Sequence, residues 1–145
     1  MESGKFKIDA KNGVVVYSLI SKGDKFVGVA KTAPGDTFDE NVGKAIAGRR
    51  VDIAVRRRDL EQVREVKHQL RTLVNTQLYY GVPKCKLYMV YYNDACEVEK
   101  RHLEKLRILK NELKCLEKGL PIPERVFNED WPKEKVYKSY SSKMN

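Results

Sequence analysis

The sequence predicts an α+β fold in which an N-terminal antiparallel β-meander is followed by two long helices that form a hairpin. Runs at residues 14–20 and 26–32 are rich in β-branched and aromatic side chains and flank the turn sequence SKGDK, which is typical of a β-hairpin. Residues 37–80 contain no proline, and a helical stripe of apolar residues runs through 84–118. The length of 145 residues is that of one domain, so we treat residues 1–145 as a single domain.

Residues 1–33 are predicted to form the meander. The segment KFKID at residues 5–9 alternates polar and apolar side chains and precedes the turn sequence KNG, so we expect it to add a third, edge strand. A sheet of this size is only marginally stable by itself. It therefore needs a helix packed against its apolar face.

The stretch TAPGDTFDENVG, residues 32–43, raises the question of whether the first helix begins at a phosphate site. A proline–glycine pair ends the preceding strand, and Thr37 with Glu40 has the spacing of a capping box. Asp36, Asp39 and Glu40 crowd the first turn, where negative charge suits the positive end of the helix dipole. Carboxylates around the amide donors oppose a bound phosphate, so we interpret the stretch as a structural cap.

The first long helix, predicted over residues 37–80, carries the seam of a paired helix. The sequence YYGVPK ends this helix with a glycine followed by a proline. A helix of this length is difficult for one small domain to cover, so we expect it to pack along a second helix, a second subunit, or both. The seam residues recur at alternating steps of three and four and are Val63, Val66, Leu70, Leu73 and Gln77.

The segment 84–118 leaves two predictions open at its start. KLYMVYY has the composition of a strand, and a strand over residues 86–92 would join the sheet. A helical stripe nevertheless continues through the whole segment, and a proline stands where the first helical turn is expected. We favour an αα-hairpin. Residues 119–145 are rich in proline and charge and are predicted to form an extended C-terminal arm.

The composition limits the classes of partner that the protein can have and the cellular compartment in which we expect it. A formal net charge of +9 favours anionic partners such as nucleotides, nucleic acid or an acidic surface. No apolar run approaches the roughly 18 residues that cross a bilayer, so no membrane partner is expected. The cysteine count of three is odd and lacks framework spacing, which is typical of a reducing compartment. We therefore expect a cytoplasmic protein.

Arginines dominate the first long helix. Arg50, Arg57, Arg64 and Arg71 are each seven residues apart and form one slowly drifting stripe on a helix, with Arg56 beside it. Arginine holds phosphate through two parallel hydrogen bonds, so the stripe indicates an anion-binding face. The alternative is a solvated face on which acidic neighbours pair with the arginines, at a few tenths of a kcal/mol for each pair.

The second helical segment adds further cations, and tyrosines gather where the two helices meet. If the helices pair antiparallel, Arg101, Arg107 and the stripe border one groove, and a tyrosine from residues 79–92 stacks on a base while guanidinium groups hold phosphate. The alternative is that these rings belong to the core and to an interface.

Catalysis and metal binding are not expected. His68 and His102 are the only histidines, and neither lies near a serine in the sequence. The cysteines are separated by eleven and nineteen residues, which is not a zinc pattern. We expect a protein that is not an enzyme and that uses neither a cofactor nor a metal.

The run FVGVAKTAPGDTFDENVGKAIAGRR, residues 26–50, resembles a pattern of small phage proteins in which a G-x-A strand is followed by P-x-D-x-F and then by glycine. Matching residues are Gly28, Ala30, Pro34, Asp36, Phe38 and Gly43. The chain is similar to the phage anti-Thoeris sponges, the first described Thoeris anti-defence family, in size and in the order of its elements. The resemblance implies a non-catalytic protein that sequesters a cyclic ADP-ribose isomer and thereby blocks host anti-phage defence. Some members also hold cyclic oligonucleotides, and members assemble as dimers or hexamers.

The resemblance also implies ligand residues by type, namely an aromatic ring, arginines and an asparagine from the helices. Two other hypotheses remain open: a basic protein that binds nucleic acid along the arginine stripe, and a helical assembly module whose charge only keeps it soluble. Taken together, the stripe and the resemblance give these candidate ligand-binding residues: Arg56, Arg57, Tyr80, Tyr92, Asn93, Arg101 and Arg107.

Overall fold

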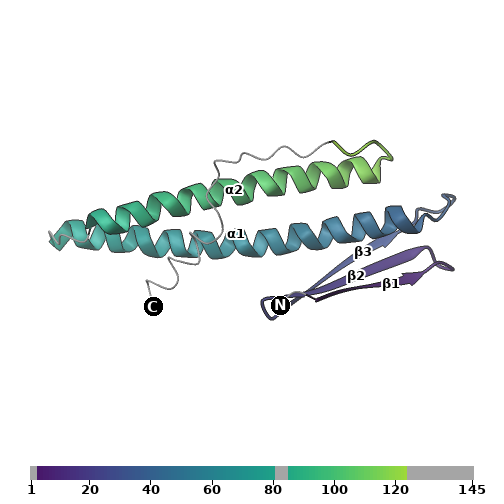
Figure 1. The fold of residues 1–145 in the computed structure, drawn as a ribbon, viewed down its shortest axis with the longest axis horizontal. Helices are drawn as coiled ribbons and strands as arrows, with labels where there is room; N and C mark the ends of the chain where they lie inside the picture. Colours follow the sequence, from purple (N-terminus) through teal and green to yellow (C-terminus); the bar gives the residue numbers. More distant parts are fainter. Residues whose placement is uncertain (1–2, 81–84, 124–145) are drawn as a thin grey trace. The chain divides into compact units, whose positions relative to one another are not determined.

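The computed structural model describes residues 3–80 and 85–123, except for the side chains of residues 77–80 and 85. Three strands are followed by two helices (Figure 1), which confirms the predicted α+β class with its meander and helical hairpin. The elements are β1 (Ser3–Asp9), β2 (Val14–Ser21), β3 (Asp24–Lys31), α1 (Glu40–Tyr80) and α2 (Cys85–Glu117).

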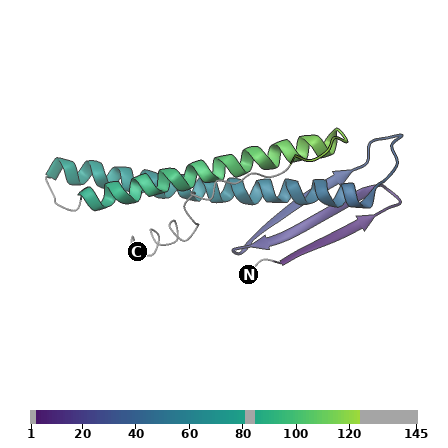
Figure 2. The same cartoon turned by 45° about the horizontal axis from the view of Figure 1, so that its top comes forward.

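The sheet is antiparallel, with β2 between β1 and β3 (Figure 2). The pairing places Tyr17 of β2 opposite Phe6 on one side and Gly28 on the other. Lys22 and Gly23 join β2 to β3 and have φ angles of 51° and 84°. Two successive positive φ angles define the turn whose twist matches that of a hairpin, and this turn sets the register of the strands.

The start of α1 differs from the predicted capping box. Oδ1 of Asp39 accepts hydrogen bonds from the backbone amides of Asn41 and Val42, at 3.0 and 3.3 Å. The helix therefore begins at Glu40, and Asp39 is its N-cap in place of Thr37. The structural role predicted for this stretch is confirmed, with the cap two residues later.

The second helix settles the alternative left open for residues 86–92, because α2 includes them all. The helix ends at Glu117, and Gly119 just beyond it has a φ of 69°. The amide of Leu120 donates to the carbonyl of Cys115 at 2.8 Å, the bond that closes a Schellman motif. Of the predicted C-terminal arm, residues 119–123 are irregular and 124–145 lie outside the described residues.

The chain forms two compact units. The first contains the sheet, α1 as far as Arg56, and α2 from Leu106 onward. The second contains α1 from Arg57 and α2 as far as Lys105. Each unit has its own apolar core.

In the first unit, α1 packs closely on the sheet because two positions have no side chain. A Cβ added at Gly28 would contact the carbonyl oxygen of Ala47 and lie 2.9 Å from Cγ2 of Val51. A Cβ at Gly43 would lie 2.7 Å from Cγ2 of Val15. The core here consists of Val15, Ala30 and Ala47, packed against Tyr17, Phe38 and Ile46.

In the second unit, the predicted seam of α1 faces α2 of the same chain. Val66 and Leu70 form a core cluster with Ala95 of α2, and Val63 is also fully buried. Leu73 is half-buried, while the side chain of Gln77 lies outside the described residues. The seam of α1 therefore packs against α2, which is the second helix that the sequence predicts.

Candidate functional site

The second unit contains a cavity of about 300 Å³. Arg71 and Val74 line it from α1, and Met89, Tyr92 and Asn93 line it from α2. A cationic group, an aromatic ring, an amide and two apolar side chains therefore line one depression that is open to solvent. This is the combination of mostly apolar walls and a few polar groups that small-ligand sites use.

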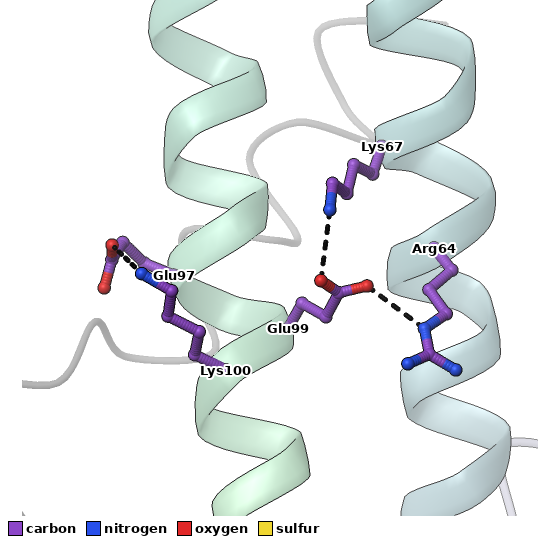
Figure 3. A network of polar contacts seen from close by, with 5 residues as sticks. All are labelled: Arg64, Lys67, Glu97, Glu99 and Lys100. Carbon is purple, nitrogen blue, oxygen red and sulfur yellow. Dashed lines mark hydrogen bonds and ion pairs between the residues drawn. The ribbon is translucent and has the colours of Figure 1, made fainter.

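One turn before Arg71, a network of charges joins α1 to α2 (Figure 3). Lys67 Nζ lies 3.1 Å from Oε1 of Glu99, and Arg64 Nε lies 3.1 Å from Oε2 of the same carboxylate. Lys67 Nζ also lies 5.7 Å from the ring centroid of Tyr92, within cation–π range. The ring that lines the cavity is thus held beside a fixed cation.

These contacts shift the pKa values of both partners. The hydrogen bond to Glu99 raises the pKa of Lys67 despite its partial desolvation. Burial by itself would raise the pKa of Glu99, but hydrogen bonds from Lys67 and Arg64, together with their charges, outweigh burial and lower it. Both groups are therefore charged at neutral pH, and Glu99 neutralises part of the positive charge next to the cavity.

Arg71 differs from its neighbours Arg64 and Lys67 in having no such counter-ion. It is exposed, and it makes no ion pair with any residue of the described ranges 3–80 and 85–123. Its guanidinium group is free to donate parallel hydrogen bonds to a phosphate. Asn93 can donate and accept hydrogen bonds from the same rim, and Tyr92 offers ring surface.

The structure brings together some of the predicted site residues. Tyr92 and Asn93, two of the predicted ligand-binding residues, both line the cavity. Arg57 belongs to the same unit and is exposed. It precedes Arg71 by fourteen residues, which is about 21 Å along a helix. The side chain of Tyr80 lies outside the described residues.

The other predicted arginines do not line this cavity. Arg101, on α2, belongs to the second unit but is buried, with only 9% of its surface exposed. Arg56 and Arg107 belong to the first unit. Each of these three arginines makes contacts within the chain, so their predicted role in ligand binding stays a prediction.

Sequence reasoning missed Lys67 and did not single out Arg71 from the stripe. One signal was present. Lys67 and Arg71 are four residues apart on α1 and therefore share one helix face. That face also contains the buried seam residues Val66 and Leu70 at its border, which places the two cations beside the second helix.

A second cavity, of about 250 Å³, lies in the first unit along the stretch 32–43. Asp36, Asp39 and Glu117 are among its lining residues. Arg50 also lines it, but its guanidinium group is bound to Glu117 and to the carbonyl oxygen of Val29. Because its rim is acidic and Arg50 is already bound to other groups, this cavity suits a phosphate less well than the cavity beside Arg71.

No group of three or more His, Cys, Asp or Glu side chains in the described part of the chain has the geometry to hold a metal ion. Within the same residues, neither helix combines the length and the apolar character needed to span a membrane.

Comparisons of the chain with protein-family models, with curated proteins and with solved structures gave no match. The function must therefore be inferred from the geometry of the site and from the sequence pattern.

Proposed function

We propose that the chain is a non-catalytic binding protein that sequesters a small cyclic nucleotide signal, a cyclic ADP-ribose isomer or a cyclic oligonucleotide, and so blocks host anti-phage defence. The observation that carries the proposal is the guanidinium group of Arg71, which has no ion-pair partner among the described residues and lies beside Tyr92 and Asn93 at one cavity. The role in defence rests on the anti-Thoeris resemblance. As with that family, we propose a homo-oligomer, a dimer or hexamer, in the host cytoplasm.

Each lining residue has a separate task in this proposal. Arg71 binds a phosphate oxygen, because an exposed arginine without a counter-ion keeps its donors available. Tyr92 stacks on the base, and Lys67 holds the ring in place through its cation–π contact. Asn93 bonds to a base edge or a ribose hydroxyl. Val74 and Met89 supply the apolar wall.

Sequestration requires retention of the ligand and no chemical step. Affinity among related binding sites is set mainly by the dissociation rate. Partial neutralisation of the site by Glu99 limits affinity for inorganic phosphate, because a ligand must also gain from ring stacking to be retained. A nucleotide supplies both the charge and the ring.

A matched pair of arginine variants tests the site. Calorimetric titration with cyclic ADP-ribose should show that Arg71→Ala binds about 10- to 100-fold more weakly, the loss expected for hydrogen bonds to a charged group. Arg57→Ala should bind like the unmodified chain, since Arg57 is also exposed and also has no ion-pair partner in the described part of the chain, but does not line the cavity. Equal affinity of the two variants would refute the site.

The absence of chemistry is tested by recovery of the ligand. The protein is incubated with the cyclic nucleotide, denatured by heat, and the released material is examined by mass spectrometry. We expect intact ligand in stoichiometric yield. Recovery of a linear or cleaved product would show that the protein is an enzyme.

The alternative proposal is a nucleic-acid-binding protein that uses the arginine stripe as a backbone track. It is favoured by the exposure of both Arg57 and Arg71 on one helix. It is disfavoured because Arg50 and Arg64 are committed to acidic partners, Glu117 and Glu99. A track that neutralises several phosphates loses affinity steeply with salt, whereas a pocket with one or two phosphate contacts does not. Equal weakening by both arginine variants, with a steep salt slope, would establish the track.

A further inference from the structure

The sheet of the first unit has two faces, and strand pairing assigns each residue to one of them. Directly paired residues share a face, and successive residues alternate. Gly28 and Val15 face α1, so the residues next to them in sequence face away from it. By the register, this outer face consists of Ser3, Lys5, Lys7, Asp9, Val14, Val16, Ser18, Ile20, Lys25, Val27, Val29 and Lys31.

The centre of the outer face is apolar, and three of its apolar side chains are exposed. Ile20, Val27 and Val29 are 48%, 55% and 43% exposed. Val16 lies directly opposite Val29 in the register, so the apolar side chains are contiguous across β2 and β3. Contiguous apolar surface on a folded protein marks an interaction site more often than scattered apolar residues do.

Lysines surround this apolar centre. Lys5 and Lys7 lie along β1, and Lys25 and Lys31 lie at the two ends of β3. All four are exposed, and none of them forms an ion pair with a residue in the described part of the chain. Asp9 is the one carboxylate on this face, and it accepts hydrogen bonds from Asn12. We call this surface the lysine-rimmed face.

We propose that the lysine-rimmed face docks an acidic amphipathic segment of another protein, whose apolar side chains cover the valines and whose Asp or Glu residues pair with the lysines. Charge complementarity carries the choice of partner. Four cations that have no counter-ion among the described residues surround an apolar centre, so the surface that fits it best is apolar within an acidic border.

Other occupants fit the face less well. Single-stranded nucleic acid binds through aromatic rings on which bases stack, and the outer face has no aromatic residue. Membrane-surface segments insert large side chains such as Trp, Phe and Leu, whereas valines predominate here. These two occupants are therefore outcomes that the experiment must distinguish.

A second copy of the chain also fits poorly. Stacking the face on itself would bring lysines toward lysines. Another exposed apolar residue, Leu103 on α2, is flanked on its helix by Lys100 and Arg107, so that surface is basic as well. These two surfaces of a second copy are therefore poor complements, and we assign the acidic complement of the lysine-rimmed face to another protein.

Fluorescence anisotropy of the full chain with two labelled synthetic peptides tests the proposal. Both peptides present one apolar face, flanked by Glu in the first and by Lys in the second. We expect the Glu peptide to bind and the Lys peptide to bind at least tenfold more weakly. Failure of the Glu peptide to bind, or equal binding of both, would overturn the proposal.

Variants then locate the binding. Lys5→Glu/Lys25→Glu should weaken binding of the Glu peptide about tenfold, and Val27→Thr should weaken it severalfold while keeping a β-branched side chain. The matched control Lys11→Glu/Lys118→Glu makes the same charge change at exposed turn positions of the same unit and should bind more tightly than the double variant of the face. Circular dichroism verifies that each variant is folded. Equal effects of both double variants, or displacement of the peptide by phosphatidylserine vesicles or single-stranded RNA, would overturn the assignment.

Discussion

The carboxylate of Glu112 accepts a hydrogen bond from Arg49 Nε at 3.3 Å, and the Glu112 side chain is only 1% exposed. The pair joins α2 to α1 inside the first unit. A charge with so little access to water depends on its partners, because its desolvation is costly unless hydrogen bonds and opposite charge offset it.

Removal of the arginine from this pair should destabilise the protein. Arg49→Ala is expected to lower the free energy of unfolding by about 3 kcal/mol, the cost of leaving a buried charge with less compensation. Urea denaturation measures this loss. Lys100→Ala removes an ion pair whose partners are 73% and 53% exposed, and the expected loss there is below about 1 kcal/mol. Similar losses in both variants would show that burial of Glu112 contributes little.

Replacing Gly28, at the contact between the sheet and α1, should lower the stability of the protein, whereas replacing Gly48 in α1 should raise it. Gly28→Ala places a methyl group against Ala47 and Val51 and should destabilise by about 1–3 kcal/mol through overpacking. At Gly48 within α1, an added Cβ meets nothing within 4 Å. Gly48→Ala should therefore stabilise by about 0.5–1 kcal/mol through helix propensity. Thermal unfolding distinguishes the two, and a stabilised Gly28→Ala would contradict the close packing.

The pH dependence of stability should reveal the network around Glu99. Its pKa in the folded chain is lowered, so its contribution to stability is present above its ordinary pKa of 4.5 and is lost as the pH falls through the folded value. Lys67 behaves in the opposite sense: its raised pKa gives a contribution present below 10.5 that is lost as the pH rises through the folded value.

Glu99→Gln should therefore be less stable than the unmodified chain at neutral pH, with the difference shrinking toward pH 3. Urea titrations across this range measure it. Glu97→Gln is the control, because Glu97 pairs with Lys100 in an exposed position on the same helix. A difference for Glu99→Gln that persists unchanged in acid would show that the network does not titrate as described. If the proposed site is correct, Glu99→Gln also binds cyclic ADP-ribose more tightly.

The core of the second unit should be sensitive to truncation at Leu70. This residue is fully buried with Val66 and Ala95, so Leu70→Ala is expected to cost about 3 kcal/mol. Leu103→Ala, at 42% exposure, should cost less than about 0.5 kcal/mol. Guanidinium denaturation compares the two. Comparable values would mean that the seam of α1 is not packed as the structure shows.

Much of the fold could be predicted because its signals are local. Alternating polar and apolar residues and a turn that contains glycine predicted the strands, and the absence of proline from residues 37–80 predicted α1. The cap was harder to locate. Thr37 and Asp39 are both good capping residues, and the choice between them depends on backbone angles in the loop that the sequence does not show.

The site could be predicted only in part, because its arginines look alike in sequence. Arg57, Arg64 and Arg71 recur every seven residues, yet Glu99 pairs with Arg64, while Arg71 has no counter-ion in the part of the chain that the structure describes. Which arginine receives an acid from α2 depends on the register of the helical hairpin. That register follows from packing between distant segments, and the periodicity of one helix does not contain it.

Arg50 donates a hydrogen bond to the carbonyl oxygen of Val29, which the register places at a position of β3 that does not bond to β2. A guanidinium group thus occupies the outer border of β3, where an incoming strand from another molecule would have to pair. An incoming strand would have to displace this guanidinium group before it could pair at Val29, so extension of the sheet at this border is disfavoured.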